Sequence, residues 1–272
     1  MITVDGIILV ISCQKFLHTR LKEINLKENY ENWKVIKVIG DLFLDCDYKL
    51  EGNLLTIKCE DSYFHIMKKE VLSFQYLYDI FDIKEGILKC NDDLIFNENN
   101  LVTFLKSPKK HKINDCEYID IDYMGKMSDY MIDFSMINYN FKYEPEKTRN
   151  DLLLVEYYKN HPEDIDNPLH NLKGVDFAKY IKSPDIGHYP GGPMVYISNK
   201  SCKILINHMS NINYDIFHYD NITDSYPYTI EDKAIAFILL SNNINIIDVK
   251  YLYVDLWDQT SDSIALHTNK YK

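Results

Sequence analysis

The stretch Gly86-Ile87-Leu88-Lys89-Cys90-Asn91-Asp92-Asp93-Leu94-Ile95-Phe96 decides the fold that we expect for this chain. Apolar residues lead into an acidic step and resume on its far side, without the spacing of a helix. A continuous apolar run of this length is typical of a buried strand in an α/β sheet. Carboxylates at the carboxyl end of such a strand lie where open α/β sheets bind ligands, and hard oxygen ligands there suit Mg²⁺ or Mn²⁺. The alternative is a strand followed by an ordinary Asn-Asp turn.

Strand and helix patterns alternate through the first 107 residues. The strongest helical pattern runs from Tyr63 to Phe81, where apolar residues recur every three or four positions and Asp61 and Ser62 supply a polar first turn. This alternation predicts a mostly parallel, doubly wound sheet. Besides the opening stretch, we expect strands over 7–11, 33–39 and 54–59, and further helices over 19–24 and over 97–105, the latter capped by Asn97.

The remainder of the chain is less regular. We expect a basic, Pro-containing loop over 106–114, a strand over 118–123 and one short helix near Leu152 within a polar region, 143–168. From Tyr189 a turn with two glycines leads into a strand. Further helices are expected over 198–208 and 229–240, and closing strands over 244–249, 251–256 and 263–267. No linker rich in Gly, Ser or Pro divides the sequence, so we expect a single domain over 1–272.

Composition excludes several classes of protein. The 272 residues, 46% of them hydrophobic, are enough to bury a sizeable core. A net charge of −11 argues against a nucleic-acid partner, which needs a basic footprint. The six cysteines form no CxxC pair, which is typical of reduced thiols in a cytosolic-type compartment. The apolar run Ile7 to Ile11 is too short to span a bilayer and lacks a basic leader, so we expect neither a membrane span nor a signal peptide.

Several segments carry a resemblance when they are taken in order. They are Ser12 through Arg20 to Ile24, Asp61-Ser62-Tyr63 with Lys69 eight residues after the Asp, Lys89 to Ile95, Tyr189 to Ser198, Glu231-Asp232, and the tail Ile264 to His267. In order and spacing they resemble the inverting β-1,3-glycosyltransferase family, which includes β-1,3-galactosyltransferases, β-1,3-N-acetylglucosaminyltransferases and the fringe proteins. The resemblance implies a glycosyltransferase-A type, Rossmann-like, doubly wound mixed sheet, with 1–107 as the nucleotide-binding half and 108–272 as the acceptor-binding and catalytic half.

The resemblance also implies a metal site. Asp93 is the expected main ligand and His267 the second, holding Mn²⁺ or Mg²⁺ against the diphosphate of a UDP-sugar donor. The alternative for His267 is a frayed surface histidine. Asn91 departs from the family, which has a carboxylate at this position. Because an amide carries no charge, we expect weaker metal binding, a neighbouring role for Asp92, or a catalytically dead relative.

Inversion requires a carboxylate that takes the proton from the acceptor hydroxyl. The resemblance places this base at Asp232, beside Glu231; the alternative is that Asp232 completes a capping box with Thr229. Arg20 and Lys69 can equally be surface charges. The glycine pair either lets backbone approach a sugar or forms a simple tight turn. The expected donor-binding set is Ser12, Arg20, Asp61, Lys69, Asn91, Asp92, Gly191, Gly192 and Glu231.

The function implied is a metal-dependent inverting glycosyltransferase. It would move a hexose or N-acetylhexosamine (GlcNAc, Gal or Glc) from a UDP-sugar to a glycan or glycoprotein hydroxyl, in a β-1,3 linkage. A competing hypothesis is a degenerate relative that only binds a nucleotide sugar or a glycan. A nucleotidyltransferase would need a Gly-rich, basic triphosphate loop near the first strand, and the sequence has none.

Location and assembly are less constrained by the sequence. The bias toward Asn, Ile, Lys, Tyr and Asp indicates an AT-rich genome, and we expect a large DNA virus as the source. The protein would then act in the cytoplasm, the virion or a viral factory. The family's anchor and stem are absent from the sequence, so the alternative is a catalytic domain cut from a longer chain. Oligomeric state is left open between a monomer and a homodimer.

Overall fold

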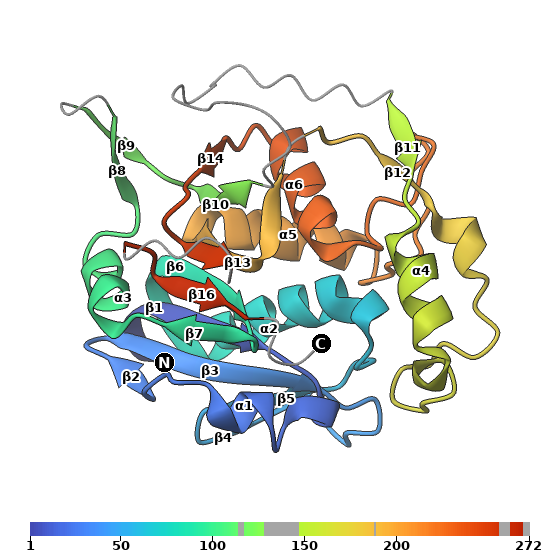
Figure 1. Cartoon of the computed structure of the whole chain (residues 1–272), viewed down its shortest axis with the longest axis horizontal. Coiled ribbons are helices and arrows are strands. Elements are labelled where there is room, and N and C mark those ends of the chain that lie inside the picture. The colour runs from blue at the N-terminus through green and yellow to red at the C-terminus, as the bar shows by residue number, and fades with distance from the viewer. Residues whose placement is uncertain (114–116, 128–146, 188, 256–261, 269–272) are drawn as a thin grey trace.

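The computed structural model describes residues 1–113, 117–127, 147–187, 189–255 and 262–268. In this part of the chain, nine strands form a central sheet (Figure 1). The strands of this sheet are β1 (Ile2–Ile11), β2 (Asn29–Tyr30), β3 (Trp33–Gly40), β4 (Tyr48–Glu51), β5 (Leu54–Ile57), β6 (Phe81–Asn91), β10 (Tyr123–Met127), β13 (Pro190–Ser198) and β14 (Ile246–Asp248). Their order is β14-β10-β13-β6-β1-β3-β5-β4, with β2 beside β3.

The sheet is mixed. β1 runs parallel to both β3 and β6, and β3 runs parallel to β5. β13 is antiparallel to its neighbours β6 and β10. The predicted α/β class with a Rossmann-like, doubly wound mixed sheet is confirmed by this topology. Since β13 pairs directly with β6, both halves of the sequence supply strands to one sheet.

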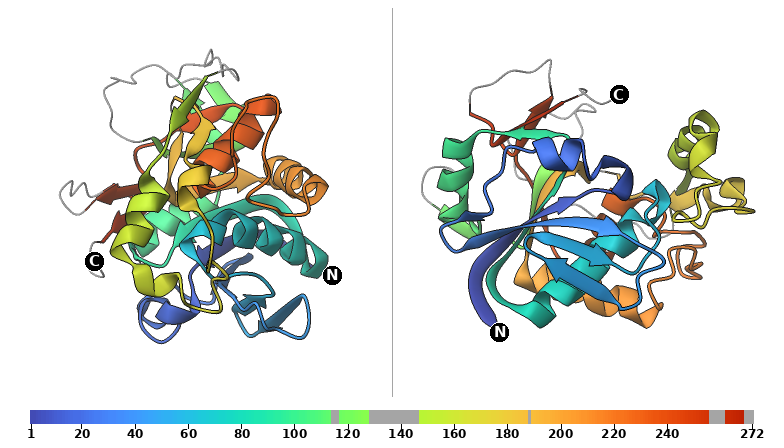
Figure 2. Two further views of the ribbon diagram at one scale, coloured as in Figure 1. Left: turned by 90° about the vertical axis from the view of Figure 1, so that its right-hand side faces the viewer. Right: turned by 90° about the horizontal axis from the view of Figure 1, so that it is seen from below.

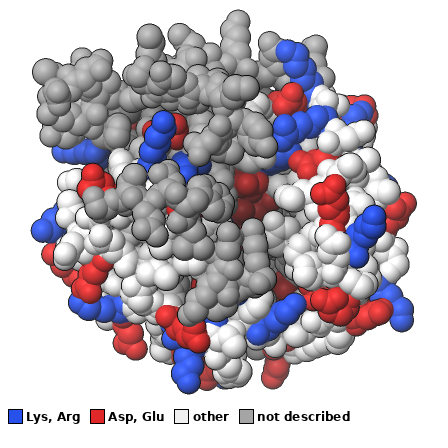
Figure 3. Space-filling view, viewed as in Figure 1, with Lys and Arg blue, Asp and Glu red and all other residues white. Residues whose placement is uncertain are grey.

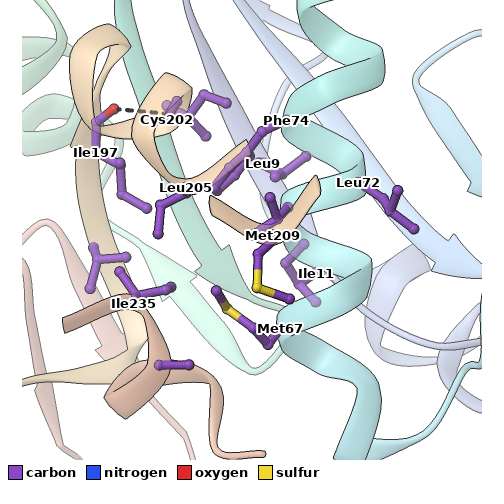
Figure 4. Packing of buried hydrophobic residues seen from close by; sticks show 14 of the residues in the cluster. Leu9, Ile11, Met67, Leu72, Phe74, Ile197, Cys202, Leu205, Met209 and Ile235 are labelled. Carbon is purple, nitrogen blue, oxygen red and sulfur yellow. Dashed lines mark hydrogen bonds between the residues drawn. The ribbon is translucent and has the colours of Figure 1, made fainter. Parts of the chain in front are cut away.

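Helices cover both faces of the sheet, and the pleat of β1 shows how. Ile7, Leu9 and Ile11 belong to the core formed with α2 (Ile66–Ile80), α5 (Asn199–Asn211) and α6 (Glu231–Ser241). Ile8 and Val10 point to the other face, toward α1 (Arg20–Glu23) and α3 (Glu98–Leu105). Figure 4 shows Leu9 and Ile11 packed with side chains of α2 and α5. A strand covered on both faces is apolar at successive positions, as β1 is from Ile7 to Ile11.

A small second sheet forms where the acidic step ends. It contains β7 (Leu94–Phe96), β16 (Ala265–His267) and β15 (Tyr253–Asp255), in the order β15-β16-β7. β16 runs antiparallel to β7, with His267 opposite Leu94. β15 runs parallel to β16, with Asp255 opposite His267. The end of the sequence is thereby brought to the turn that follows β6.

The outer segments complete the described chain. They are η1 (Gln14–Phe16), η2 (Tyr63–His65), β8 (Lys110–Ile113), β9 (Glu117–Asp120), β11 (Thr148–Asn150), α4 (Leu153–Asn160), η3 (Pro162–Asp164), η4 (Phe177–Tyr180) and β12 (Lys182–Pro184). α4 stands at one side of the molecule in all three ribbon views (Figures 1 and 2). Within the described residues we find no helix with the length and apolarity needed to cross a bilayer.

Several predicted boundaries are wrong. The helix expected over 63–81 begins as the 3-10 turn η2 and ends at Ile80, so β6 starts at Phe81, earlier than the opening stretch indicated. The expected loop 106–114 contains strand β8, which pairs with β9, and the single strand expected over 118–123 is divided between β9 and β10. Pairing with a partner strand overrides local propensity in each case. Cys116, His188, Leu256 and residues 143–146 lie outside the described residues.

Candidate active site

The ends of β1 and β6 lie at the same edge of the sheet. The two strands pair in parallel, with Ile11 opposite Asn91, so Ser12 and Asp92 emerge side by side. The Ser12 hydroxyl donates to Asp92 Oδ2 at 2.5 Å, and Arg20 Nη1 lies 3.6 Å from Asp92 Oδ1. Burial raises the pKa of Asp92, while Ser12 and Arg20 oppose that shift. These three predicted residues therefore form one cluster, next to the half-buried Asn91.

A buried ion pair supports this cluster from below. The Lys69 ammonium donates to Asp61 Oδ1 at 2.7 Å and to the Ser12 carbonyl at 2.6 Å. Asp61 also accepts from the backbone N–H groups of Gln14 and Gly40. Burial lowers the pKa of Lys69, but the charge and hydrogen bond of Asp61 together with Cys59 and Cys13 outweigh it, and the net shift is upward. The surface-charge alternative is wrong for Lys69, and Arg20 is mostly buried with its guanidinium 3.8 Å from the centre of the Phe16 ring.

The turn after β6 brings a carboxylate to the C-terminal histidine. His267 Nε2 lies 3.3 Å from Asp93 Oδ2, and Thr268 donates both its N–H and its hydroxyl to the Asp93 carbonyl. The His267 side chain is 23% exposed, so it is not a frayed surface residue. The other Asp93 oxygen, Oδ1, is buried without a hydrogen-bond partner among the described residues. Asp93 thus has one oxygen beside the imidazole and one with spare acceptor capacity.

Two residues that the sequence analysis missed complete this side. Asp255 Oδ1 lies 2.9 Å from His267 Nδ1, on the far side of the ring from Asp93. Lys126 Nζ lies 3.4 Å from Asp255 Oδ2 and 5.3 Å from the centre of the Tyr253 ring. For Asp255, the signal in the sequence was the short run Tyr253-Val254-Asp255. In a strand, its first and third side chains, Tyr253 and Asp255, point to the same face, which is the face that His267 occupies. In the described part of the chain, no three His, Cys, Asp or Glu side chains converge on a point where a metal ion could sit.

A second group of carboxylates surrounds a buried lysine. Lys89 Nζ donates to Glu231 Oε1 at 2.8 Å and to the Gly192 carbonyl at 2.7 Å, and lies 3.8 Å from Glu70 Oε2. Lys89 is only 1% exposed. Burial raises the pKa of Glu70 well above its usual range, and the nearby charge of Glu231 adds to the shift. The direction of this shift favours the protonated form of Glu70, and Lys89 and Glu231 form the ion pair of the group.

Asp232 follows Glu231 at the start of α6. Burial and the charge of Glu231 raise the pKa of Asp232 to about 7, against the opposing effects of a hydrogen bond from the Lys233 N–H and the charge of Lys89. The capping-box alternative is wrong, because Ile230 is the N-cap and the Thr229 hydroxyl bonds the Tyr226 carbonyl instead. A carboxylate with a pKa near neutrality is suited to general-base chemistry.

The two glycines lie in β13 between the two groups. The tight-turn alternative is wrong, since both are strand residues. A Cβ on Gly192 would lie 3.0 Å from Glu231 Oε2, and one on Gly191 would lie 2.8 Å from the Tyr253 hydroxyl. The Tyr253 ring in turn meets the His267 ring edge to face at 6.0 Å. The glycine pair therefore lies between the carboxylates around Lys89 and the residues around His267. Figure 3 shows acidic side chains recessed near the middle of one face.

Comparison with known proteins adds little to this geometry. No family model and no curated protein matches the chain. Among solved structures, the chain is similar to the apo form of mouse xyloside xylosyltransferase 1, with a TM-score of 0.40 and 8% identity over 99% of this chain and 98% of that chain. Similarity at this level fixes neither family nor activity, so a functional assignment has to come from the site itself.

Proposed function

We propose that this chain is a metal-dependent inverting glycosyltransferase that transfers a hexose or N-acetylhexosamine from a UDP-sugar to a hydroxyl of a glycan or glycoprotein. One observation carries the proposal. Glu231, the neighbour of Asp232, lies at Gly192, and Tyr253, whose ring contacts that of the Asp93 partner His267, lies at the adjacent Gly191. Glycosyl transfer from a diphosphate needs the leaving group's charge neutralised and the acceptor's proton removed. The two groups are suited to these two tasks.

Two protein ligands, Asp93 and His267, would be available to a divalent metal ion, and the diphosphate and water would fill its other positions. Asp93 Oδ1 is an acceptor without a partner in the described residues, and Asp255 on Nδ1 orients the ring so that Nε2 faces Asp93. A carboxylate on the outer nitrogen is the usual support of a metal-binding histidine. Asp93 and His267 would hold Mn²⁺ or Mg²⁺. When bound, such an ion would stabilise the negative charge that develops on the leaving diphosphate.

Protein groups do the remaining work in this proposal. Ser12, Arg20 and Asp92 are placed to contact the nucleotide, since they lie where a doubly wound sheet binds its ligand. Asp232 accepts the proton of the acceptor hydroxyl as that oxygen attacks from the face opposite the diphosphate. Its pKa, raised to about 7, lies near neutral pH. A general base with a pKa close to the working pH is ionised often enough to act and is still basic enough to take the proton.

One observation favours the competing binding-module hypothesis. Asp92 already contacts Ser12 and Arg20, and Asn91 carries no charge. Asp93 is therefore the one residue of this acidic step whose carboxylate faces His267. A site with few charged ligands binds Mg²⁺ or Mn²⁺ weakly. A protein that holds a nucleotide sugar without transferring it needs no more than this.

UDP release from a panel of UDP-sugars with Mn²⁺ tests the proposal. The proteins compared are the wild type, Asp232→Asn, His267→Ala and the control Asp45→Asn, which changes an exposed carboxylate. We expect slow, metal-dependent release from one donor, strongly reduced in the first two variants and unchanged in the control. Binding of UDP without turnover, with or without added acceptors, would support the binding module. No binding of any UDP compound would overturn both the glycosyltransferase and a module that binds a nucleotide sugar.

A further inference from the structure

Three aromatic rings, one from η2 and two from the C-terminal end of α4, lie in succession at the side of the molecule. Tyr63, the first residue of η2, is 42% exposed and stacks on Tyr157 with ring centroids 4.6 Å apart and an interplanar angle of 24°. Tyr157 in turn contacts the His161 ring, again with centroids 4.6 Å apart. We call Tyr63, Tyr157 and His161 the aromatic column. Tyr63 ends the column, and its exposure leaves ring surface available to a ligand.

The column is held in place by the chain around it. Ser62 caps η2 by accepting from the His65 N–H, and the Phe64 N–H donates to the hydroxyl of Tyr158 on α4 at 3.1 Å. The Tyr157 hydroxyl donates to Asp164 Oδ2, also at 3.1 Å. A ring that is already ordered loses little conformational entropy when a ligand binds it. An exposed but fixed aromatic ring is the kind of residue that carries binding energy.

The aromatic column lies next to the candidate base. Asp151, just before α4, forms an ion pair with Lys233, the neighbour of Asp232. Figure 1 shows α4 beside the N-terminal end of α2, where η2 begins. Partial burial of the Tyr63 side chain, which is 42% exposed, raises the pKa of its hydroxyl to about 12, and the charges of Asp232 and Glu231 add to that shift. η2, α4 and the start of α6 therefore meet around the acceptor side of the site, which is distinct from the residues around His267.

We infer that Tyr63 is the stacking platform for the acceptor, and that the acceptor is a pyranose sugar of a glycan. This inference rests on the proposed function and names its acceptor class. A pyranose presents an apolar C–H face bordered by hydroxyls, so it can cover an aromatic ring while a ring hydroxyl reaches a carboxylate at its edge. Asp232 is that carboxylate. A serine or threonine of a protein acceptor offers no ring face to cover Tyr63.

Saturation-transfer NMR tests the platform without relying on turnover. The probes are the methyl β-glycosides of galactose, glucose, xylose and N-acetylglucosamine, added to the protein with UDP and Mn²⁺. We expect at least one glycoside to bind the wild type, Tyr63→Ala to weaken it about tenfold and Tyr63→Phe to change it less than about threefold, which is the scale of one aromatic contact. Phe43→Ala, which removes another exposed aromatic side chain, is the matched control and leaves binding unchanged.

The possible outcomes separate this inference from the proposed function. UDP affinity, measured by calorimetry on the same variants, shows whether the nucleotide site is present and the protein folded. Glycoside binding that Tyr63→Ala does not weaken, or no glycoside binding to a wild type that binds UDP, would overturn the platform alone. Tyr63-dependent glycoside binding by a protein that binds no UDP compound would overturn the glycosyltransferase and keep the platform as a glycan-binding site.

Discussion

Two groups of acidic side chains flank the glycine pair, and they differ in what lies at their centre. Asp93 and Asp255 lie on opposite sides of the His267 imidazole, which is partly exposed. Glu70 and Glu231 lie around the Lys89 ammonium, which is fully buried. In the first group, hydrogen bonding to Asp93 raises the pKa of His267 against the effect of burial, and hydrogen bonding to Asp255 adds to the rise, so a metal ion would have to replace the proton on the ring nitrogen. The second group already contains its cation.

This difference shows that the number of carboxylates in a cluster does not determine what it binds. One ammonium balances one carboxylate, so further acidic groups near Lys89 hold protons instead, as the raised pKa values of Glu70 and Asp232 indicate. Around His267, in the part of the chain that the structure describes, no lysine lies between the two carboxylates as Lys89 does. The Lys126 ammonium lies 3.4 Å from Asp255 Oδ2, whereas Asp255 Oδ1 faces His267. We therefore expect one group to bind metal ions and the other to bind protons. The variants below test that division.

The largest effect should come from the proton-binding side. Asp232→Asn removes the candidate base, and loss of a general base lowers transfer by about 10²–10⁴-fold. UDP affinity should stay within about twofold, because the residue lies away from the nucleotide cluster in our assignment. Steady-state kinetics and calorimetry measure the two quantities. An equal loss of UDP binding would show that Asp232 is not confined to the acceptor side.

Lys89→Met tests whether the lysine is the cation of its group. It leaves Glu231 without its ion-pair partner and should lower the free energy of unfolding by about 3–5 kcal/mol, the cost of breaking a buried pair. Urea unfolding measures this change. Glu70→Gln is the matched variant in the same group: because Glu70 is already neutral, it should change stability by less than about 1 kcal/mol. A large loss in Glu70→Gln would mean that Glu70 is ionised.

Asp255→Asn tests the metal-binding side. Removing the carboxylate that orients His267 should weaken Mn²⁺ binding about 10–100-fold. Electron paramagnetic resonance of free Mn²⁺ measures the affinity directly, without a sugar or an acceptor. Asp45→Asn serves again as the control for removing one negative charge. An unchanged Mn²⁺ affinity in Asp255→Asn would contradict the assignment of His267 as a ligand.

The smallest effect is a shift in pH dependence. The base must be ionised, so kcat/KM should rise with pH through an apparent pKa of about 7, the value to which burial and Glu231 raise Asp232. Glu231→Gln removes the neighbouring negative charge. The ionised form of Asp232 then becomes more favourable, its pKa falls and the acid limb moves to lower pH. A limb that stays in place or moves upward would exclude electrostatic coupling between the two residues.

Local sequence patterns predicted most of the fold. The apolar runs of β1, β3, β5 and β6 and the spacing of α2 are each visible within a few residues, because burial sets the period of apolar positions. Errors lie where partners come from far away in the chain. Strand β8 is polar and basic and forms by pairing with β9. The glycines of β13 lie between Pro190, which pairs with Met127 of β10, and Met194, which pairs with Cys90 of β6.

The site was predictable only in part, for the same reason. The structure brings Asp93 to His267 as the resemblance implied, and brings Ser12, Arg20 and Asp92 together. Asp255 and Lys126 were missed because their roles depend on the register of β15 and β16, which no local pattern shows. Glu70 was not predicted either, because the spacing of apolar residues does not show that the polar residues Lys69, Glu70 and Ser73 of α2 are also buried.

β16 is three residues long and supplies the histidine, yet the central sheet is complete before it, since β14 ends at Asp248. During translation, the residues of all nine strands of that sheet are therefore synthesised before His267. A reading frame interrupted after residue 248 would encode a sheet with all its strands but no imidazole beside Asp93. A late nonsense or frameshift mutation in the gene would then remove His267 together with buried residues of the second core, among them Leu252 and Ile264, so that loss of the imidazole and loss of packing would occur together.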